Sequence, residues 1–104
     1  MHRRAFIMTV HPGQQEEYER RHDEIWPELE DLFKAHGVRS HSIYLQEGTN
    51  QLFAYLEYES EEQMASLSAM PEVQRWWKFM AEIMPANADS SPESIPLREV
   101  YHFE

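Results

Sequence analysis

A tyrosine and a histidine, Tyr18 and His22, are the side chains in this sequence best suited to acid–base chemistry. They stand four residues apart, so on a helix they lie on the same face. The apolar residues that follow continue that face at helical spacing, which predicts that both side chains point inward; they are Ile25, Trp26, Leu29, Leu32 and Phe33. Histidine titrates near neutral pH, so an inward imidazole can both donate and accept a proton. The alternative is a core histidine whose ring bonds a backbone carbonyl, and the pattern alone leaves it open.

Two adjacent tryptophans, Trp76 and Trp77, are the second unusual feature. Neighbouring residues on a helix point about 100° apart, so the two indoles cannot face one spot squarely. One interpretation places one indole in the core and the other at an interface. The other is a sugar platform, in which indole faces cover the C–H groups of a pyranose and indole N–H groups donate to hydroxyls. The presence of His22 and Tyr18, which adds a phenol, favours the sugar platform.

The other residue types exclude several kinds of site. No pair of histidines has metal-binding spacing; the five besides His22 are His2, His11, His36, His41 and His102. There are 3 glycines and no phosphate-binding loop, no nucleophilic serine elbow, and no cysteine. We therefore expect neither a metal site nor a cofactor.

The composition bounds the class of protein. With 104 residues the chain predicts a single domain spanning residues 1–104, whose modest core makes oligomerisation plausible. Its 19 acidic and 9 basic residues give a net charge of -10, which argues against nucleic acid and anionic membranes as partners. No apolar run approaches the roughly 20 residues of a membrane span. The apolar segment after the basic start is too short for a signal peptide, so we expect a cytoplasmic protein.

The first half of the chain predicts a strand and a long helical region that carries His22. The apolar run of residues 5–10 is typical of a buried strand, and helical periodicity extends over residues 14–35, with Gly37 as its stop. Pro27 interrupts this region, because proline removes a helical hydrogen bond and clashes with the preceding turn. Either the helix kinks near Asp23, or it ends and a second helix begins with Pro27 in its first turn.

The second half predicts a hairpin, two more helical segments and a last strand. The sequence predicts strands at residues 39–46 and 52–58, joined by a turn at 47–50. Ser60 is predicted to cap a helix that extends to about residue 68. Pro71 starts another helix, whose apolar face extends to Met84. A polar loop at 85–92 leads to a strand at 97–103. This order predicts an α+β, ferredoxin-like antiparallel sheet with helices on one face. Apolar residues occur at both parities of the strands, so we expect a homodimer, a dimeric α+β barrel, in which a second subunit covers the other face.

Stretches spread over nearly the whole chain match one known family. They are Ala5-Phe6, Glu16-Glu17-Tyr18, Arg20-Arg21-His22, Ile25-Trp26-Pro27-Glu28-Leu29-Glu30, Ile43-Tyr44-Leu45, Gln74-Arg75-Trp76-Trp77-Lys78 and Met84-Pro85-Ala86-Asn87. By these residues the chain resembles the L-rhamnose mutarotase family, and the His22 segment combined with the tandem tryptophans is the specific part. The resemblance implies a cofactor-free homodimer that interconverts the α and β anomers of L-rhamnopyranose. It also implies that His22 is the proton donor and that Tyr18, Trp76 and Trp77 contact the sugar.

Three residues depart from the pattern of that family. His41 stands where a sugar-contacting tyrosine is usual, and Ala88 and Ser90 lie in a loop that usually has proline and asparagine. His41 shares the parity of Ile43 and Leu45, so it faces inward if they do. Either it replaces the tyrosine as a sugar-binding residue, or it fills space at the subunit interface. These changes leave the reaction in place and bear on the identity of the sugar.

Two other functions fit the same residues. A cofactor-free monooxygenase of the dimeric α+β barrel class would also enclose histidine, tyrosine and tryptophan around an aromatic substrate. A non-catalytic sugar-binding dimer would need the platform and no proton donor. Oxygen uptake distinguishes the first of these from a mutarotase, and an uncatalysed rate of anomer exchange distinguishes the second.

Overall fold

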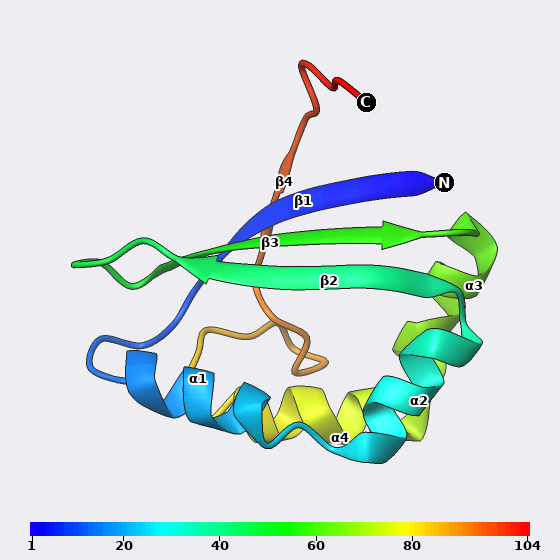
Figure 1. Cartoon of the computed structure of the whole chain (residues 1–104). Coiled ribbons are helices and arrows are strands. Elements are labelled where there is room, and N and C mark those ends of the chain that lie inside the picture. The colour runs from blue at the N-terminus through cyan, green and yellow to red at the C-terminus, as the bar shows by residue number, and fades with distance from the viewer.

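A computed structural model describes residues 1–104, and its four strands form one antiparallel sheet with the helices on a single face (Figure 1). In chain order the elements are β1 (His2–Thr9), α1 (Gln15–Asp23), α2 (Pro27–Ala35), β2 (Val38–Leu45), β3 (Gln51–Tyr58), α3 (Glu61–Ser66), the 3-10 turn η1 (Leu67–Ala69), α4 (Pro71–Met80) and β4 (Ile95–Leu97). The strand order is β2-β3-β1-β4. This confirms the predicted ferredoxin-like α+β fold.

The register of the sheet decides which side chains face the helices. In β3 every second residue is buried against them: Leu52, Ala54, Leu56 and Tyr58. Residues paired with these face the same way, because side chains alternate along a strand. Met8 of β1 pairs with Leu52, and His41 of β2 pairs with Leu56. The helix-facing side of the sheet therefore carries both core residues and a histidine.

Pro27 ends one helix and starts the next, so the second of the two predicted alternatives is right. Helix α1 ends at Asp23, and α2 begins at Pro27 after an extended Trp26 with φ -64° and ψ 127°. Proline at the first helical position loses no hydrogen bond, and its fixed φ suits the helix. The break leaves His22 in the last turn of α1 and turns Trp26 toward α4.

The last strand is shorter than predicted and lies earlier in the chain. Only Ile95–Leu97 pair with β1, opposite residues 5–7, whereas residues 97–103 were expected to form the strand. Beyond Leu97 the backbone makes no ladder; instead, the carboxylate of Glu99 accepts from the Arg3 guanidinium at 3.0 and 3.1 Å. An apolar alternation predicts strand character, but the chain leaves the edge of β1 after Leu97, although residues 2–4 of β1 continue along that edge. Figure 1 shows this C-terminal segment extending on the side of the sheet away from the helices.

The core lies between the sheet and the helices and includes two residues beyond the end of α4. Ile83 and Met84 are buried there although the helix ends at Met80, earlier than the apolar face suggested. The amide of His11 donates to the Ile83 carbonyl at 2.8 Å, which ties this turn to the loop after β1. No helix in the structure is long and apolar enough to cross a membrane.

Candidate active site

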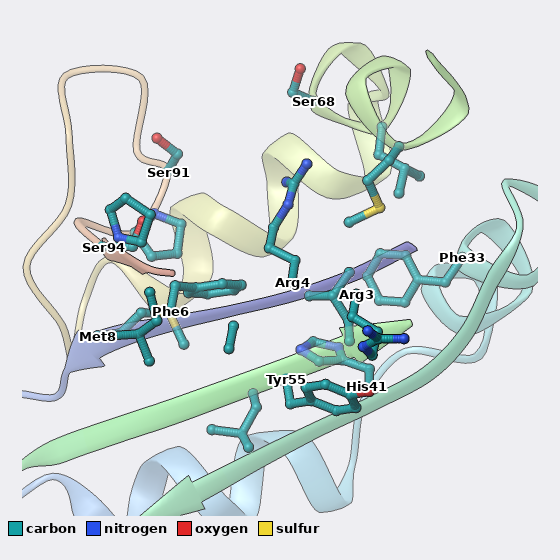
Figure 2. Close-up of a pocket in the computed structure, with 18 of the residues that line it drawn as sticks. Arg3, Arg4, Phe6, Met8, Phe33, His41, Tyr55, Ser68, Ser91 and Ser94 are labelled. Carbon is teal, nitrogen blue, oxygen red and sulfur yellow. The ribbon is translucent and has the colours of Figure 1, made fainter. Parts of the chain in front are cut away.

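A cavity of about 1200 Å³ is lined by the helices and the helix-facing side of the sheet, and it extends to residues of the other sheet face and of the C-terminal segment, such as Tyr55 and Glu99. All five residues predicted from the sequence as site residues line it: Tyr18, His22, His41, Trp76 and Trp77. They come from α1, β2 and α4, three elements that the fold brings together around one space. Figure 2 shows part of the wall, where His41 and Phe33 approach from β2 and α2 and Phe6 rises from β1.

One nitrogen of His22 is held by the backbone, and the other is free. Nδ1 lies 3.0 Å from the carbonyl oxygen of Tyr18, one turn earlier in α1. A carbonyl only accepts, so Nδ1 carries a hydrogen, and Nε2 of the neutral ring is an acceptor. Nε2 has no hydrogen-bond partner in the protein, and the ring lines the cavity. The backbone bond expected for a core histidine is therefore present, and it fixes the ring with its second nitrogen available to a ligand.

Aromatic rings surround His22 on two sides. The Tyr18 ring stacks on it at 4.4 Å between centroids, and Trp76 meets it edge-on at 5.3 Å. Desolvation in this environment lowers the pKa of His22 below its ordinary value, while the hydrogen bond to the Tyr18 carbonyl and the charge of Asp23 act in the opposite direction. The neutral ring is thereby favoured in the free protein.

Three further polar atoms line the cavity without a partner in the protein. They are the hydroxyl of Tyr18 and the indole nitrogens of Trp76 and Trp77. No buried side-chain nitrogen or oxygen in the structure lacks a hydrogen bond, so each of these unpaired atoms is accessible to solvent, and its residue lines the cavity. Buried polar groups are normally paired, because desolvating them otherwise costs free energy. Burial also raises the pKa of the Tyr18 phenol, which keeps its hydroxyl a donor at neutral pH.

The two tryptophans line the same cavity from different depths. Trp76 is buried and packs edge-on against Trp26 at 5.1 Å and beside Phe79 at 5.9 Å. Trp77 is half-buried, as the 100° rotation between neighbouring helical residues requires. Trp77 lies on the helix side of the sheet and lines the cavity, and its place at a subunit interface remains a prediction.

His41 faces the helices, as its parity with Ile43 and Leu45 predicted. The edge of the Phe33 ring approaches its imidazole at 6.4 Å between centroids. More than a third of the residue is accessible through the open cavity, yet its apolar surroundings, and then the charge of His22, lower its pKa. Both interpretations of His41, sugar binding and space filling at the subunit interface, remain predictions.

Arg21 was not predicted from the sequence, although it sets the position of α1 against α4. Its Nε donates to Glu17 at 2.7 Å, Nη1 to the backbone carbonyl of Phe79 at 2.7 Å, and Nη2 to Glu82 at 3.1 Å. The guanidinium also lies 3.9 Å from the centroid of the Phe79 ring. In the sequence it is one arginine of a charged helix, and nothing in its spacing distinguishes it from Arg20.

The loop at residues 85–92 also contributes to the cavity, through Asn87 and Ser91. It is closed by a hydrogen bond from the Asn87 amide to the Ser91 carbonyl at 2.8 Å and by one from Asn87 Nδ2 to Ser91 Oγ at 3.1 Å. Ser90 has a φ of 72°, the left-handed region needed for this turn. The run of asparagine, aspartate and serine indicated a turn but not that the turn would face the site.

Comparison with known proteins gives the family. A family model described as L-rhamnose mutarotase matches residues 3–103. A relative of that name from Opitutus terrae is 52% identical over 104 residues, all of both chains. Another, from Escherichia coli, is 51% identical over 102 residues, 98% of each chain. The chain belongs to the L-rhamnose mutarotase family. Mutarotases exchange the anomers of a sugar, so the class of enzyme is an isomerase, as the resemblance in the sequence implied.

Solved structures agree with this family. The crystal structure of an L-rhamnose mutarotase from Formosa agariphila has a TM-score of 0.91 and 44% identity, and all of both chains are covered. A putative antibiotic biosynthesis monooxygenase from Bordetella bronchiseptica has a TM-score of 0.69 at 16% identity, over 95% of this chain and 96% of that one. At that identity the likeness shows the fold alone. The chain thus shares only its fold with the monooxygenase, whereas it shares both fold and sequence with the mutarotase family.

Proposed function

We propose that this chain interconverts the α and β anomers of L-rhamnopyranose in the cavity described above. One observation carries the proposal: an aromatic cavity presents His22 Nε2, the Tyr18 hydroxyl and two indole N–H groups, all without partners in the protein. A pyranose offers such a site hydroxyls for the polar atoms and C–H faces for the indoles. The names of the relatives supply the particular sugar.

The chemistry needs one well-placed proton-transfer group and no covalent intermediate. Opening the ring of a hemiacetal requires a proton on the ring oxygen and loss of the proton on the anomeric hydroxyl; closing on the other carbonyl face reverses both. When the His22 ring is protonated, Nε2 is the proton donor, because the carbonyl of Tyr18 holds the ring by Nδ1. Positioned acid–base catalysis of this kind typically accelerates a reaction about 10²–10⁴-fold.

The remaining residues bind and orient the sugar. Tyr18 donates from a phenol that stays protonated, Trp76 and Trp77 supply indole faces and N–H groups, and His41 bonds a hydroxyl from the opposite wall. Phe6 and Met8 add an apolar surface beside them, which suits the methyl group of a 6-deoxy sugar. The acidic chain favours a neutral substrate over a phosphorylated one.

The active form is a homodimer in this proposal, and its partner covers the open face of the sheet. That face exposes Tyr44, Ile95 and Leu97, with fractional exposures of 66%, 64% and 43%. Beyond β4, the C-terminal segment exposes Val100, Tyr101 and Phe103 as well. Large exposed apolar patches mark interaction sites, and two such sheets packed face to face would remove this one from water. We place the enzyme in the cytoplasm.

Saturation-transfer NMR between the anomeric protons of L-rhamnose tests the function. We expect the wild-type protein to transfer saturation between the α and β signals well above the uncatalysed rate, without oxygen. Sugar-dependent shifts of protein signals with exchange at the uncatalysed rate would instead indicate a sugar-binding dimer. Oxygen uptake with a phenolic substrate, together with no anomer exchange, would indicate a monooxygenase.

A further inference from the structure

His22 presents a single nitrogen to the cavity, and the reaction has two proton transfers. Its Nδ1 is engaged by the Tyr18 carbonyl at 3.0 Å, so only Nε2 can reach a ligand. One nitrogen cannot protonate the ring oxygen and take the proton of the anomeric hydroxyl at the same moment. A second group, either a water molecule or another side chain of the cavity, must therefore accept a proton.

Most other titratable side chains of the cavity are poor acceptors. The pKa of the buried Tyr18 phenol is raised, so the phenolate is scarce at neutral pH. Glu99 is engaged by Arg3 through two hydrogen bonds, and His102 lies near it in the C-terminal segment, away from the helix side of the sheet (Figure 1). Glu61 lies outside the cavity lining and binds Arg4 and Tyr58.

His41 is the group that remains on the same side of the sheet as His22. Neither of its ring nitrogens makes a hydrogen bond within the protein, and the cavity leaves the residue accessible. The elements packed around it present apolar side chains: Phe33 from α2, Leu56 from β3, Met64 from α3 and Leu67 from η1. The one titratable group that acts on it electrostatically is His22, from α1.

We propose that His41 is the second proton-transfer residue, the base that takes the anomeric proton while His22 acts as the acid. This rests on the proposed function and goes beyond it, because His41 then reacts rather than only binds. Protonated His22 gives its Nε2 proton to the ring oxygen, the bond between that oxygen and C1 breaks, and its electron pair stays on the oxygen. The anomeric O–H proton passes to a nitrogen of His41 as the C1 carbonyl forms. After rotation about C1–C2, both transfers reverse on the other face.

One proton is thus shared between two imidazoles, and the pair returns to its starting state in every exchange. The charge of one ring lowers the proton affinity of the other, so the doubly protonated pair is disfavoured. The tyrosine that the resemblance leads one to expect at this position would not accept a proton at neutral pH. The assignment is therefore specific to chains with histidine here.

His41→Gln is the variant that tests the assignment, because glutamine keeps hydrogen-bonding capacity and cannot take up a proton. His36→Gln is the matched control: His36 bonds the Leu32 carbonyl through Nδ1 at 3.0 Å in α2, as His22 bonds Tyr18 in α1, and it lies outside the cavity lining. Anomer exchange of L-rhamnose is measured by saturation transfer as a function of sugar concentration and pH.

We expect His41→Gln to lower kcat about 10²-fold with KM changed less than threefold. The wild-type pH profile of kcat/KM should be bell-shaped, and the acid limb, where His41 takes up a proton, should be absent in the variant. His36→Gln should match the wild type. A folded His41→Gln enzyme with wild-type kcat, or with the acid limb intact, would overturn the assignment and leave the proposed function standing. Absence of exchange in the wild type would overturn both.

Discussion

At the scale of single residues, the site consists of polar atoms that the fold leaves without partners. Folded proteins rarely leave such atoms unpaired in a partly buried place, because the lost hydrogen bonds to water are not replaced. Here unpaired polar atoms occur around one cavity, on His22, Tyr18, Trp76 and Trp77. In the proposed function a sugar supplies the missing partners.

Replacing Tyr18 by phenylalanine isolates the hydroxyl from the ring. The ring stacks on His22 at 4.4 Å and should stay in place, because the hydroxyl has no partner in the protein. We expect sugar binding to weaken about 3- to 10-fold, the effect of one neutral hydrogen bond of about 0.5–1.5 kcal/mol, with the fold intact. Titration by NMR measures the affinity and urea unfolding the stability. Unchanged affinity would mean that the hydroxyl does not touch the sugar.

Stability should fall as the pH drops from 7 to 5. The pKa values of His22 and His41 are lowered in the folded protein from the ordinary value of 6.5, so the unfolded chain takes up protons first as the pH falls through that value. Protons then favour the unfolded state. Urea unfolding at a series of pH values measures this slope, and the double replacement His22→Gln, His41→Gln should flatten it. The same slope in the double variant would rule out these two residues as its source.

Protonation of the surface carboxylate Glu17 would lower the stability in a different pH range. Glu17 has a pKa held at about 2 by hydrogen bonds from Arg20 and Arg21, so any stability it contributes is lost below about pH 4.5. The interval from pH 7 to 5 therefore reports the histidines with little overlap.

The sequence identified residues that line one cavity because they carry distinctive side chains at helical spacing. It did not show that the His22 ring is held by the backbone and also leaves one nitrogen free, since that depends on which nitrogen meets the Tyr18 carbonyl. Arg21 was missed for a related reason. Its role depends on the carbonyl of Phe79, 58 residues away in the chain, and backbone atoms leave no mark in a sequence.

At the scale of elements, α1 and α4 must stay in register to hold His22 beside Trp76. Arg21 joins them and is only 10% exposed at its side chain, whereas its neighbour Arg20 is 53% exposed and bonds only Glu17 and Glu24. The two arginines make a natural pair for comparison, because both bind Glu17 and only one reaches α4.

Arg21→Met should destabilise the fold by about 1–3 kcal/mol, because the Phe79 carbonyl loses its partner in a partly buried place. Arg20→Met should cost less than about 1 kcal/mol, as is typical of exposed ion pairs. Urea unfolding at pH 7 compares the two. Equal costs would show that the link between α1 and α4 contributes nothing beyond surface charge.

Two elements show where sequence patterns stop being sufficient. Pro27 predicted an interruption of the first helical region, but the choice between a kink and a new helix depended on how Trp26 packs against Trp76. The apolar alternation at residues 97–103 predicted a strand, and the pairing stops at Leu97 although residues 2–4 of β1 continue along the same edge. Periodicity gives the faces of an element, and tertiary partners decide its ends.

At the scale of the whole molecule, the sheet has one covered and one open face. The helices cover the side with the cavity, and the other side exposes Tyr44, Ile95 and Leu97 (Figure 1). For a chain of 104 residues, dimerisation is a common way to bury more apolar surface.

The wild-type protein should sediment at micromolar concentration with twice its chain mass of 12.5 kDa. Tyr44→Glu should shift it to the monomer, because a carboxylate buried in an apolar interface would be desolvated without a partner. Lys78→Glu, an exposed change on α4, is the control and should remain a dimer. A well-folded wild-type monomer at that concentration would contradict the face-to-face arrangement.

The most direct test of the account is the rate of anomer exchange in His22→Gln. Saturation transfer between the anomeric protons of L-rhamnose gives the rate, and NMR titration shows whether the variant still binds the sugar. We predict that the folded variant binds L-rhamnose within a few-fold of the wild type and exchanges its anomers at least about 10²-fold more slowly. A folded variant that binds the sugar and exchanges anomers near the wild-type rate would show that His22 is not the acid and would contradict the account.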